Sequence, residues 1–274
     1  MRFTCIQLSI HVQFRKRENK GAIHMSIYNI TFSPTGGTQR VSDCLCSAAG
    51  EEFIQIDLTD RAFDPSAIAL SENDLCVVSV PSFAGRVPKT AAQRISLLKG
   101  NGAKAALVAV YGNRAYEDTL IELKTLLSES GFRCIAAVAA IAEHSMLRQY
   151  AAGRPDTQDM AELQQFGRKI AEIAASDSLP ADLYVPGNIP YRAIGAFLKP
   201  IVNENCIVCG VCADMCPVGA IPADTPSSTD TDACISCVRC VSVCPVQARM
   251  LDPNTLAAVE QRIGPALKIG RAHV

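Results

Sequence analysis

The sequence predicts an α/β protein in which a doubly wound parallel sheet of five strands is followed by a small α+β domain rich in cysteine. Strand-like and helix-like segments alternate from residue 25 to about residue 178. This alternation favours β-α units with right-handed crossovers and therefore parallel strands. Eight of the thirteen cysteines then fall between Cys206 and Cys244. Such crowding after a cysteine-poor segment indicates metal ligation in a reducing compartment rather than a disulfide framework.

Each strand of the predicted sheet is a short run of Val, Ile, Ala and aromatic residues, as expected for strands buried on both faces. The five runs are Ile27–Phe32, Phe53–Leu58, Asp74–Val80, Ala105–Tyr111 and Arg133–Ile141. Helical patterns separate or follow them at Thr38–Ala49, Lys89–Leu98, Tyr116–Ser130 and Pro155–Ser176. Five strands connected in this way fit a sheet of order 2-1-3-4-5.

We divide the chain into five parts. Residues 1–24 are interpreted as a disordered extension or a misplaced start, with a basic arm as the alternative. The sheet domain spans residues 25–178, a proline-rich connector spans 179–200, and the cysteine-rich domain spans 201–252. Residues 253–274 are interpreted as a tail whose end, "KIGRAHV", resembles a translated sequencing adapter, so we expect the natural C-terminus to be missing. Apolar residues of the connector are expected to pack on the sheet domain and to hold the cysteine-rich domain near the loops at Phe83 and Tyr111. A wrapped linker with the cysteine motifs facing outward is the alternative.

Composition restricts the function classes. The formal net charge is −1, which indicates neither a nucleic-acid partner nor a membrane surface. The longest apolar run, Cys134 to Ala142, is too short to span a bilayer. We therefore expect a cytoplasmic protein.

Two copies of one cysteine motif stand 28 residues apart. "CIVCGVCADMCP" begins at Cys206 and "CISCVRCVSVCP" begins at Cys234, and both read C-x2-C-x2-C-x3-C-P. Three evenly spaced thiolates suit one face of a cubane cluster, whereas zinc sites usually use two separated pairs of ligands. The repeat resembles the bacterial two-[4Fe–4S] ferredoxins across about residues 201–252.

That resemblance implies a crossed ligation, because the fourth cysteine of each motif in two-cluster ferredoxins binds the other cluster. It assigns Cys206, Cys209, Cys212 and Cys244 to the first [4Fe–4S] cluster. It assigns Cys234, Cys237, Cys240 and Cys216 to the second. The remaining cysteines, namely Cys5, Cys44, Cys46, Cys76 and Cys134, are interpreted as structural.

A glycine loop follows the first predicted strand. "SPTGGT", from Ser33 to Thr38, offers hydroxyl donors, two glycines and a helix N-terminus, which together can hold a phosphate without a charged side chain. An ordinary strand-to-helix turn is the alternative. The stretch resembles the FMN phosphate loop of flavodoxins, with Gly37 where the usual asparagine stands. No dinucleotide fingerprint is present, so FMN is expected rather than FAD.

Two later loops resemble those that hold the flavin ring in flavodoxins. They are "VPSFAGRVP" after the third strand and "YGNRAYED" after the fourth. Phe83 and Tyr111 are equally compatible with core positions. The FMN-binding residues implied by the three loops are Ser33, Thr35, Gly36, Gly37, Thr38, Pro81, Ser82, Phe83, Gly85, Arg86, Tyr111, Gly112, Asn113, Arg114 and Tyr116.

The order of parts resembles ferredoxins with an N-terminal flavodoxin-like domain, known mainly from anaerobic bacteria and archaea. The resemblance implies an electron-transfer protein that carries two [4Fe–4S] clusters and FMN. One alternative is a flavin-dependent reductase fed by the clusters. No acid/base pair or nucleophile stands out for it, and Arg86, Arg114 and His144 are the candidates near the flavin. A second alternative is a ferredoxin whose flavodoxin-like domain has lost flavin and serves for docking.

Overall fold

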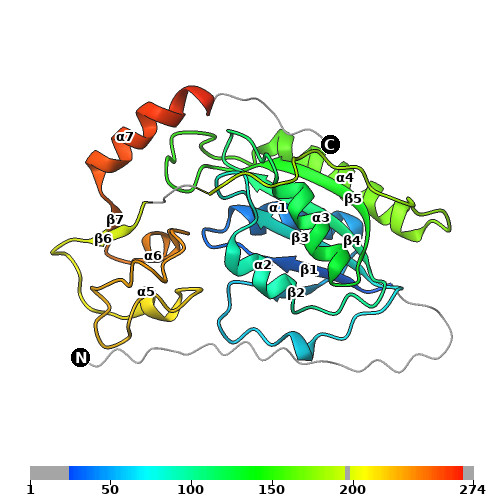
Figure 1. Cartoon of the computed structure of the whole chain (residues 1–274), viewed down its shortest axis with the longest axis horizontal. Helices are drawn as coiled ribbons and strands as arrows, with labels where there is room; N and C mark the ends of the chain where they lie inside the picture. Colours follow the sequence, from blue (N-terminus) through cyan, green and yellow to red (C-terminus); the bar gives the residue numbers. More distant parts are fainter. Residues whose placement is uncertain (1–24, 195–197, 268–274) are drawn as a thin grey trace.

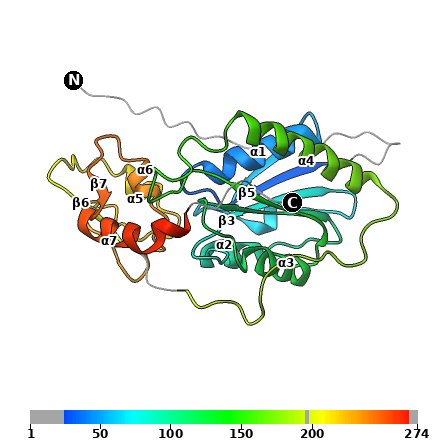
Figure 2. The same cartoon turned by 90° about the horizontal axis from the view of Figure 1, so that it is seen from above.

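The computed structural model describes residues 25–194 and 198–267. A five-stranded sheet with helices on both faces forms the larger part of the molecule (Figure 1). The cysteine-rich part lies beside it, at the end of the sheet where the strands finish (Figures 1 and 2). None of the helices in these described ranges has the length and apolar character needed to cross a membrane.

The sheet has the predicted strand order. It contains β1 (Ile27–Thr31), β2 (Ile54–Asp57), β3 (Leu75–Pro81), β4 (Lys104–Tyr111) and β5 (Arg133–Ile141) in the order β2-β1-β3-β4-β5. Every neighbouring pair is parallel. The prediction of a flavodoxin-like doubly wound sheet is therefore confirmed. The loops that follow β1, β3 and β4 consequently emerge at one edge, as expected for ligand binding in such sheets.

Two helices cover each face of the sheet. Figure 2 shows α1 (Gly37–Ala49) and α4 (Thr157–Ala175) on one face, with α2 (Lys89–Ile95) and α3 (Thr119–Glu129) on the other. Alternate strand residues face opposite layers, which gives the sheet two apolar cores. Val77 of β3 packs beneath α1 and α4, and its neighbour Val78 packs beneath α2 and α3.

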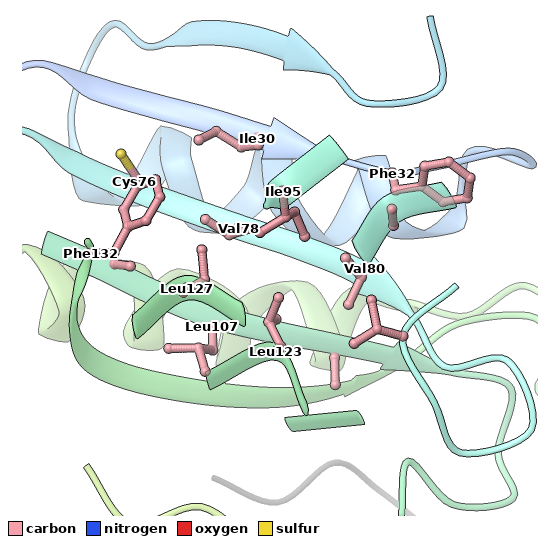
Figure 3. Packing of buried hydrophobic residues seen from close by; sticks show 14 of the residues in the cluster. Ile30, Phe32, Cys76, Val78, Val80, Ile95, Leu107, Leu123, Leu127 and Phe132 are labelled. Atoms are coloured by element: carbon pink, nitrogen blue, oxygen red, sulfur yellow. The ribbon is translucent and has the colours of Figure 1, made fainter. Parts of the chain in front are cut away.

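The core under α2 and α3 holds the larger side chains (Figure 3). Ile30, Val78 and Leu107 belong to three adjacent strands, and they pack against Leu123 and Leu127 of α3. All five are fully buried. Burial of each such side chain stabilises the fold by roughly 1.5–3 kcal/mol. This core fixes the strands whose carboxyl ends carry the loops described below.

The cysteine-rich part is built around its repeat. A two-stranded antiparallel sheet of β6 (Pro200–Val202) and β7 (Arg249–Leu251) closes it. Between these strands lie the one-turn helices α5 (Val211–Asp214) and α6 (Arg239–Ser242). Both strands lie close together in Figure 1, although 46 residues of chain separate Val202 from Arg249.

A helix follows this domain, at the start of residues 253–274, which the sequence predicts to be a tail. Helix α7 spans Pro253–Ile263, and a short 3₁₀ turn, Gly264–Ala266, continues it. Asp252 caps α7, because its carboxylate accepts a hydrogen bond of 2.8 Å from the backbone N–H of Thr255. Asp before Pro is a recognisable helix start, so this helix could have been predicted. A second 3₁₀ turn, Pro65–Ala67, precedes β3.

The connector packs partly on the sheet domain, as expected. Val185 is buried against the core under α3. Asp118, itself 1% exposed, accepts hydrogen bonds from the backbone N–H groups of Asn188 and Arg192 at 2.8 and 2.7 Å. Other apolar connector residues remain exposed: Tyr184, Ile189 and Ile194. Phe197 lies outside the described residues. Polar contacts to one buried carboxylate, more than apolar burial, therefore hold the connector.

Candidate functional site

The loop after β1 forms the N-terminus of α1. Gly36 is the N-cap residue and adopts φ +88°, a left-handed conformation that favours glycine. The hydroxyl of Ser33 accepts a hydrogen bond of 2.9 Å from the backbone N–H of Gln39, so Ser33 caps the helix. A Cβ added to Gly37 would lie 3.2 Å from the Cβ of Ala142. The backbone at Gly36 therefore favours glycine, a side chain at Gly37 would be crowded by Ala142, and the loop presents neutral donors at a helix N-terminus.

Polar residues beneath this loop hold α1 on the sheet. The hydroxyl of Ser42 donates to Asn29 Oδ1 at 2.5 Å and lies 2.7 Å from the hydroxyl of Ser79. Asn29, Ser42 and Ser79 are fully buried. Such a satisfied polar network fixes the position of the helix start relative to β1 and β3.

A cavity of about 450 Å³ lies at the carboxyl edge of the sheet. Pockets that bind small molecules span roughly 300–1,000 Å³, so this cavity is large enough for a mononucleotide. Nine of the fifteen residues predicted for FMN line it: Thr35, Gly37, Thr38, Pro81, Ser82, Phe83, Tyr111, Gly112 and Arg114. All three predicted loops thus contribute to a single cavity.

The other six predicted residues support the loops and do not line the cavity: Ser33, Gly36, Gly85, Arg86, Asn113 and Tyr116. Arg86 donates two hydrogen bonds, at 2.7 and 2.8 Å, to the carboxylate of Glu122, and its guanidinium lies 4.8 Å from the Tyr191 ring centre. Asn113 donates to the carbonyl of Leu267 at 2.6 Å. The ring of Tyr116 packs edge-on against Tyr111, with ring centres 5.5 Å apart. The polar groups of Arg86 and Asn113, which were predicted to contact flavin, thus form hydrogen bonds within the protein instead.

His144 lines the same cavity from the loop after β5. Its Nδ1 accepts hydrogen bonds from the backbone N–H groups of Met146 and Leu147, at 3.3 and 3.1 Å. Burial, and then the positive charge of Arg114, lower the pKa of His144 below its ordinary value of 6.5. The ring is therefore a neutral part of the wall.

Arginines give the cavity wall a positive character. Arg114 forms two hydrogen bonds of 2.8 Å with the carboxylate of Glu117, which also pairs with Arg192. Arg262 of α7 lines the cavity, and it forms no ion pair within the ranges that the structure describes. Glu117 thus balances two of the three cations, and Glu143, which also lines the cavity, pairs with Arg148 outside the lining. This wall and the neutral loop at Gly36 fit an anionic ligand such as FMN.

Sequence reasoning missed the part of the cavity that comes from the second half of the chain. Ser236 and Cys237 of the second cysteine motif line it together with residues of α7. The residues outside the predicted set include Glu143, Ser145, Met146, Arg192, Leu198, Ser236, Cys237, Val259, Arg262 and Ile263. Glu143, Ser145 and Met146 follow β5 beside His144, so their place at this edge could have been expected. The residues of the second half reach the cavity only through the packing of the two domains, which no local signal indicates.

Arginine side chains join the two halves next to this cavity. Arg239, beside Cys240, donates to the hydroxyl of Thr59 at 2.8 Å and to the carbonyl of Ser33 at 3.5 Å. Arg94 of α2 donates to the carbonyl of Pro217 at 2.9 Å. These bonds hold the cysteine motifs against the loops after β1 and β2.

The structure brings together the first predicted set of cluster cysteines. Cys206, Cys209, Cys212 and Cys244 line one small cavity in the cysteine-rich part. Cys244 belongs to the second motif, so this set is crossed. Burial raises the pKa of Cys244, but the backbone N–H groups of residues 246–249 outweigh burial and lower it. These donors favour a thiolate.

The second predicted set also converges. Burial raises the pKa of Cys237 to about 12 and that of Cys240 to about 11, and the charges of Cys216 and Cys234 contribute to both shifts. Cys216 of the first motif therefore lies near the cysteines of the second motif. Across residues 25–194 and 198–267, no three Cys, His, Asp or Glu side chains are arranged to hold a single metal ion.

Backbone geometry repeats with the motif. The N–H groups of Ala220 and Ala248 donate to Cys216 Sγ and Cys244 Sγ at 3.3 and 3.2 Å. Left-handed φ values recur at offsets of 28 residues in the pairs Val208 and Ser236, Gly210 and Val238, and Gly219 and Gln247. The two copies thus fold alike and direct equivalent N–H groups at the sulfurs, an arrangement that tunes iron–sulfur potentials.

Two buried polar atoms fit the presence of clusters. The hydroxyl of Ser236 and the Nε of Arg249 are buried and have no hydrogen-bond partner within the described part of the chain. Ser236 lies between Cys234 and Cys237, and Arg249 lines the cavity of the first cysteine set. Unpaired buried polar atoms are costly, so their position beside the cysteines indicates that a bound group completes their hydrogen bonding.

The other described cysteines lie in the sheet domain. Burial raises the pKa values of Cys44, Cys46, Cys76 and Cys134. A raised pKa disfavours the thiolate that metals and nucleophilic chemistry require. Their environment agrees with a structural role, and Cys5 lies outside the described residues.

Comparison with known proteins supports the second half. Residues 205–248 match the family model described as a 4Fe-4S dicluster domain. No curated protein matches the chain. The chain therefore combines a flavodoxin-like domain, defined by its own strand order, with a 4Fe–4S domain.

Solved structures similar to the first half include flavodoxins. An archaeal flavodoxin shares 14% identity over 56% of this chain and 100% of its own, with a TM-score of 0.40. The Streptococcus pneumonia TIGR4 flavodoxin shares 17% identity over 54% and 99%, with a TM-score of 0.41. A flavodoxin, WrbA-like protein from Agrobacterium tumefaciens shares 13% identity over 55% and 98%, with a TM-score of 0.42.

Proposed function

We propose that this flavodoxin-like and 4Fe–4S chain is an electron-transfer flavoprotein that relays electrons within one molecule. Two [4Fe–4S] clusters held by the crossed cysteine sets would exchange electrons with FMN bound at the carboxyl edge of the sheet. FMN supplies the exchange between one-electron and two-electron chemistry. The chain itself supplies position, burial and hydrogen bonds.

One observation carries the proposal. The three loops predicted to hold flavin line the cavity, and Ser236 and Cys237 line it as well. Cys237 is assigned to the second cluster. A ligand in this cavity therefore contacts the residues that surround a cluster, with no separate protein layer between them. The bonds of Arg239 to Thr59 and Ser33 keep this arrangement in place.

The residues of the cavity have distinct roles in this proposal. The N-terminus of α1 and the hydroxyls of Thr35 and Thr38 bind the phosphate. Phe83 and Tyr111 would line the part of the cavity that takes the ring, where Tyr111 is itself buried and packs edge-on against Tyr116, and neutral His144 and the backbone at Gly112 would close the wall. Helix α7 adds Val259 and Ile263 to the lining of the cavity. The partners are other redox proteins.

Cofactor analysis after anaerobic reconstitution tests the proposal. We expect about eight irons with matching sulfide, and one FMN, per chain. Zinc instead of iron would contradict the cluster assignment. Iron without flavin would favour the docking module over the relay. Turnover of NAD(P)H or quinones at a steady rate would favour the reductase.

The crossed ligation has its own test. Cys216→Ala should damage the cluster held by Cys234, Cys237 and Cys240, although Cys216 belongs to the first motif. Cys134→Ala, in the sheet domain, is the control and should keep all the iron. Cluster spectra of Cys216→Ala, of Cys237→Ala and of the double variant would show whether both substitutions remove the same cluster. Loss of two different clusters would establish the uncrossed arrangement.

A further inference from the structure

Arg249 is a buried cation at a position where the repeat elsewhere has an apolar residue. It lies in β7, five residues after Cys244, and is 2% exposed. The equivalent residue of the first copy, 28 positions earlier, is Ile221, which is 3% exposed. The two copies therefore share one backbone path and one degree of burial, but only the second buries a charge.

No carboxylate balances this charge in residues 25–194 or 198–267, because none of the ion pairs there includes Arg249. Its Nη1 donates to the hydroxyl of Thr229 at 2.7 Å, and its Nη2 donates to the carbonyls of Pro226 and Ser228 at 2.5 and 2.7 Å. The buried Nε has no partner among the described residues. The loop between the two motifs therefore holds the outer end of the guanidinium and leaves Nε unpaired.

A buried charge without a counter-ion costs several kcal/mol. We therefore expect an anion to bind near Arg249. The cavity that Arg249 lines is also lined by Cys206, Cys209, Cys212 and Cys244. Arg249 thus lies beside this set of thiols.

We propose that Arg249 is the internal counter-ion of the cluster bound by Cys206, Cys209, Cys212 and Cys244, with its Nε–H donating to that cluster. The proposal rests on the proposed function, because it requires that the cluster is bound. Reduction takes one electron from an external low-potential donor, breaks no bond, and adds negative charge to a centre that four thiolates already make anionic. The guanidinium stabilises the reduced form more than the oxidised form, so it raises the reduction potential of this cluster.

The test is a redox titration of the reconstituted full chain, with dithionite as the donor and electron paramagnetic resonance as the readout. Arg249→Gln removes the charge, Arg249→Lys retains it, and Ile221→Met changes the equivalent residue of the other copy without any change of charge. We expect Arg249→Gln to lower the equilibrium constant for one-electron reduction of one cluster at least tenfold, or about 59 mV. Arg249→Lys should recover most of this loss, and Ile221→Met should leave both potentials unchanged.

The outcomes separate this inference from the proposed function. An Arg249→Gln protein with its full iron content and unchanged potentials would overturn the inference and leave the function intact. If the unsubstituted chain binds no iron, the proposed function itself fails. If Arg249→Gln loses iron, Arg249→Met provides a second neutral variant. Loss of iron from both neutral variants but not from Arg249→Lys would support the counter-ion role, whereas equal loss from all three would contradict it.

Discussion

Gly36 shows how one residue can control ligand binding through its backbone. Its φ of +88° is left-handed, and a Cβ added there would meet no atom within 4 Å. A side chain at this position therefore strains the loop rather than colliding with the protein. The N-terminus of α1 would lose its alignment with the ligand.

We predict that Gly36→Val abolishes FMN binding while the sheet remains folded. Gly153→Val is the matched control, because Gly153 also has a positive φ, +74°, with no atom within 4 Å of an added Cβ. It lies in the turn before α4 and not at the N-terminus of α1. Fluorescence titration with FMN measures both variants. Equal loss of affinity in the two would mean that general strain, and not the phosphate loop, is responsible.

His144 makes stability depend on pH. Because burial and Arg114 lower its pKa below 6.5, the unfolded chain binds a proton more readily than the folded chain. The contribution of neutral His144 is therefore present above pH 6.5 and is lost as the pH falls below it. His144→Asn keeps an acceptor for the N–H groups of Met146 and Leu147 but cannot titrate.

We expect the unfolding free energy of the unsubstituted chain to fall more steeply than that of His144→Asn between pH 7 and pH 5. Denaturant titrations at several pH values measure the difference. A difference that stays constant over this range would show that His144 is not held neutral by its surroundings.

At the scale of elements, the connector depends on one buried carboxylate. Asp118 at the start of α3 accepts three hydrogen bonds from Asn188 and Arg192. Burial raises the pKa of Asp118, but these bonds and the charge of Arg86 outweigh burial and lower it. Asp118 is therefore ionised and fixes the path of the connector toward the cysteine-rich domain.

We predict that Asp118→Asn lowers the unfolding free energy of the sheet domain by about 2–3 kcal/mol, because hydrogen bonds to a buried charge are lost. It should also expose residues 179–194 to proteases. Asp182→Asn is the control, since Asp182 is a largely exposed connector residue that pairs with Lys124. Similar proteolysis of the two variants would show that Asp118 does not hold the connector.

Helix α7 is the element that sequence reasoning described least well. The start signal at Asp252 and Pro253 is local and could have been used. The role of α7 as a wall of the cavity is not local, because Val259 and Ile263 reach the site only through the packing of the two domains. The same holds for Ser236, whose place in the cavity no motif indicates.

At the scale of the molecule, the sheet was predictable because buried parallel strands have a composition that tertiary context rarely overrides. The repeated spacing made the two cysteine motifs recognisable, whereas the crossed assignment of their fourth cysteines follows only from the resemblance to two-cluster ferredoxins. The cavity was predicted in part: nine residues of the three loops line it, whereas Arg86 and Asn113 form protein contacts instead. Sequence reasoning correctly expected polar groups at this edge but could not distinguish those that bind a ligand from those that support loops.

The proposed electron relay depends on how the two domains are arranged. The cavity is lined both by the three loops predicted to hold flavin and by Cys237. Arg239 and Arg94 form hydrogen bonds between the two domains beside it. If this arrangement persists in solution, electron transfer between the halves does not require two molecules to meet.

Rapid kinetics tests this claim most directly. The clusters of the reconstituted chain are reduced in a fast mixing or flash experiment, and the flavin absorbance is followed over a tenfold range of protein concentration. Gly36→Val protein, which should lack FMN, gives the background signal. The account predicts a rate constant for flavin reduction that does not change with protein concentration. A rate that rises in proportion to concentration would contradict it, because the two halves would then exchange electrons only between molecules.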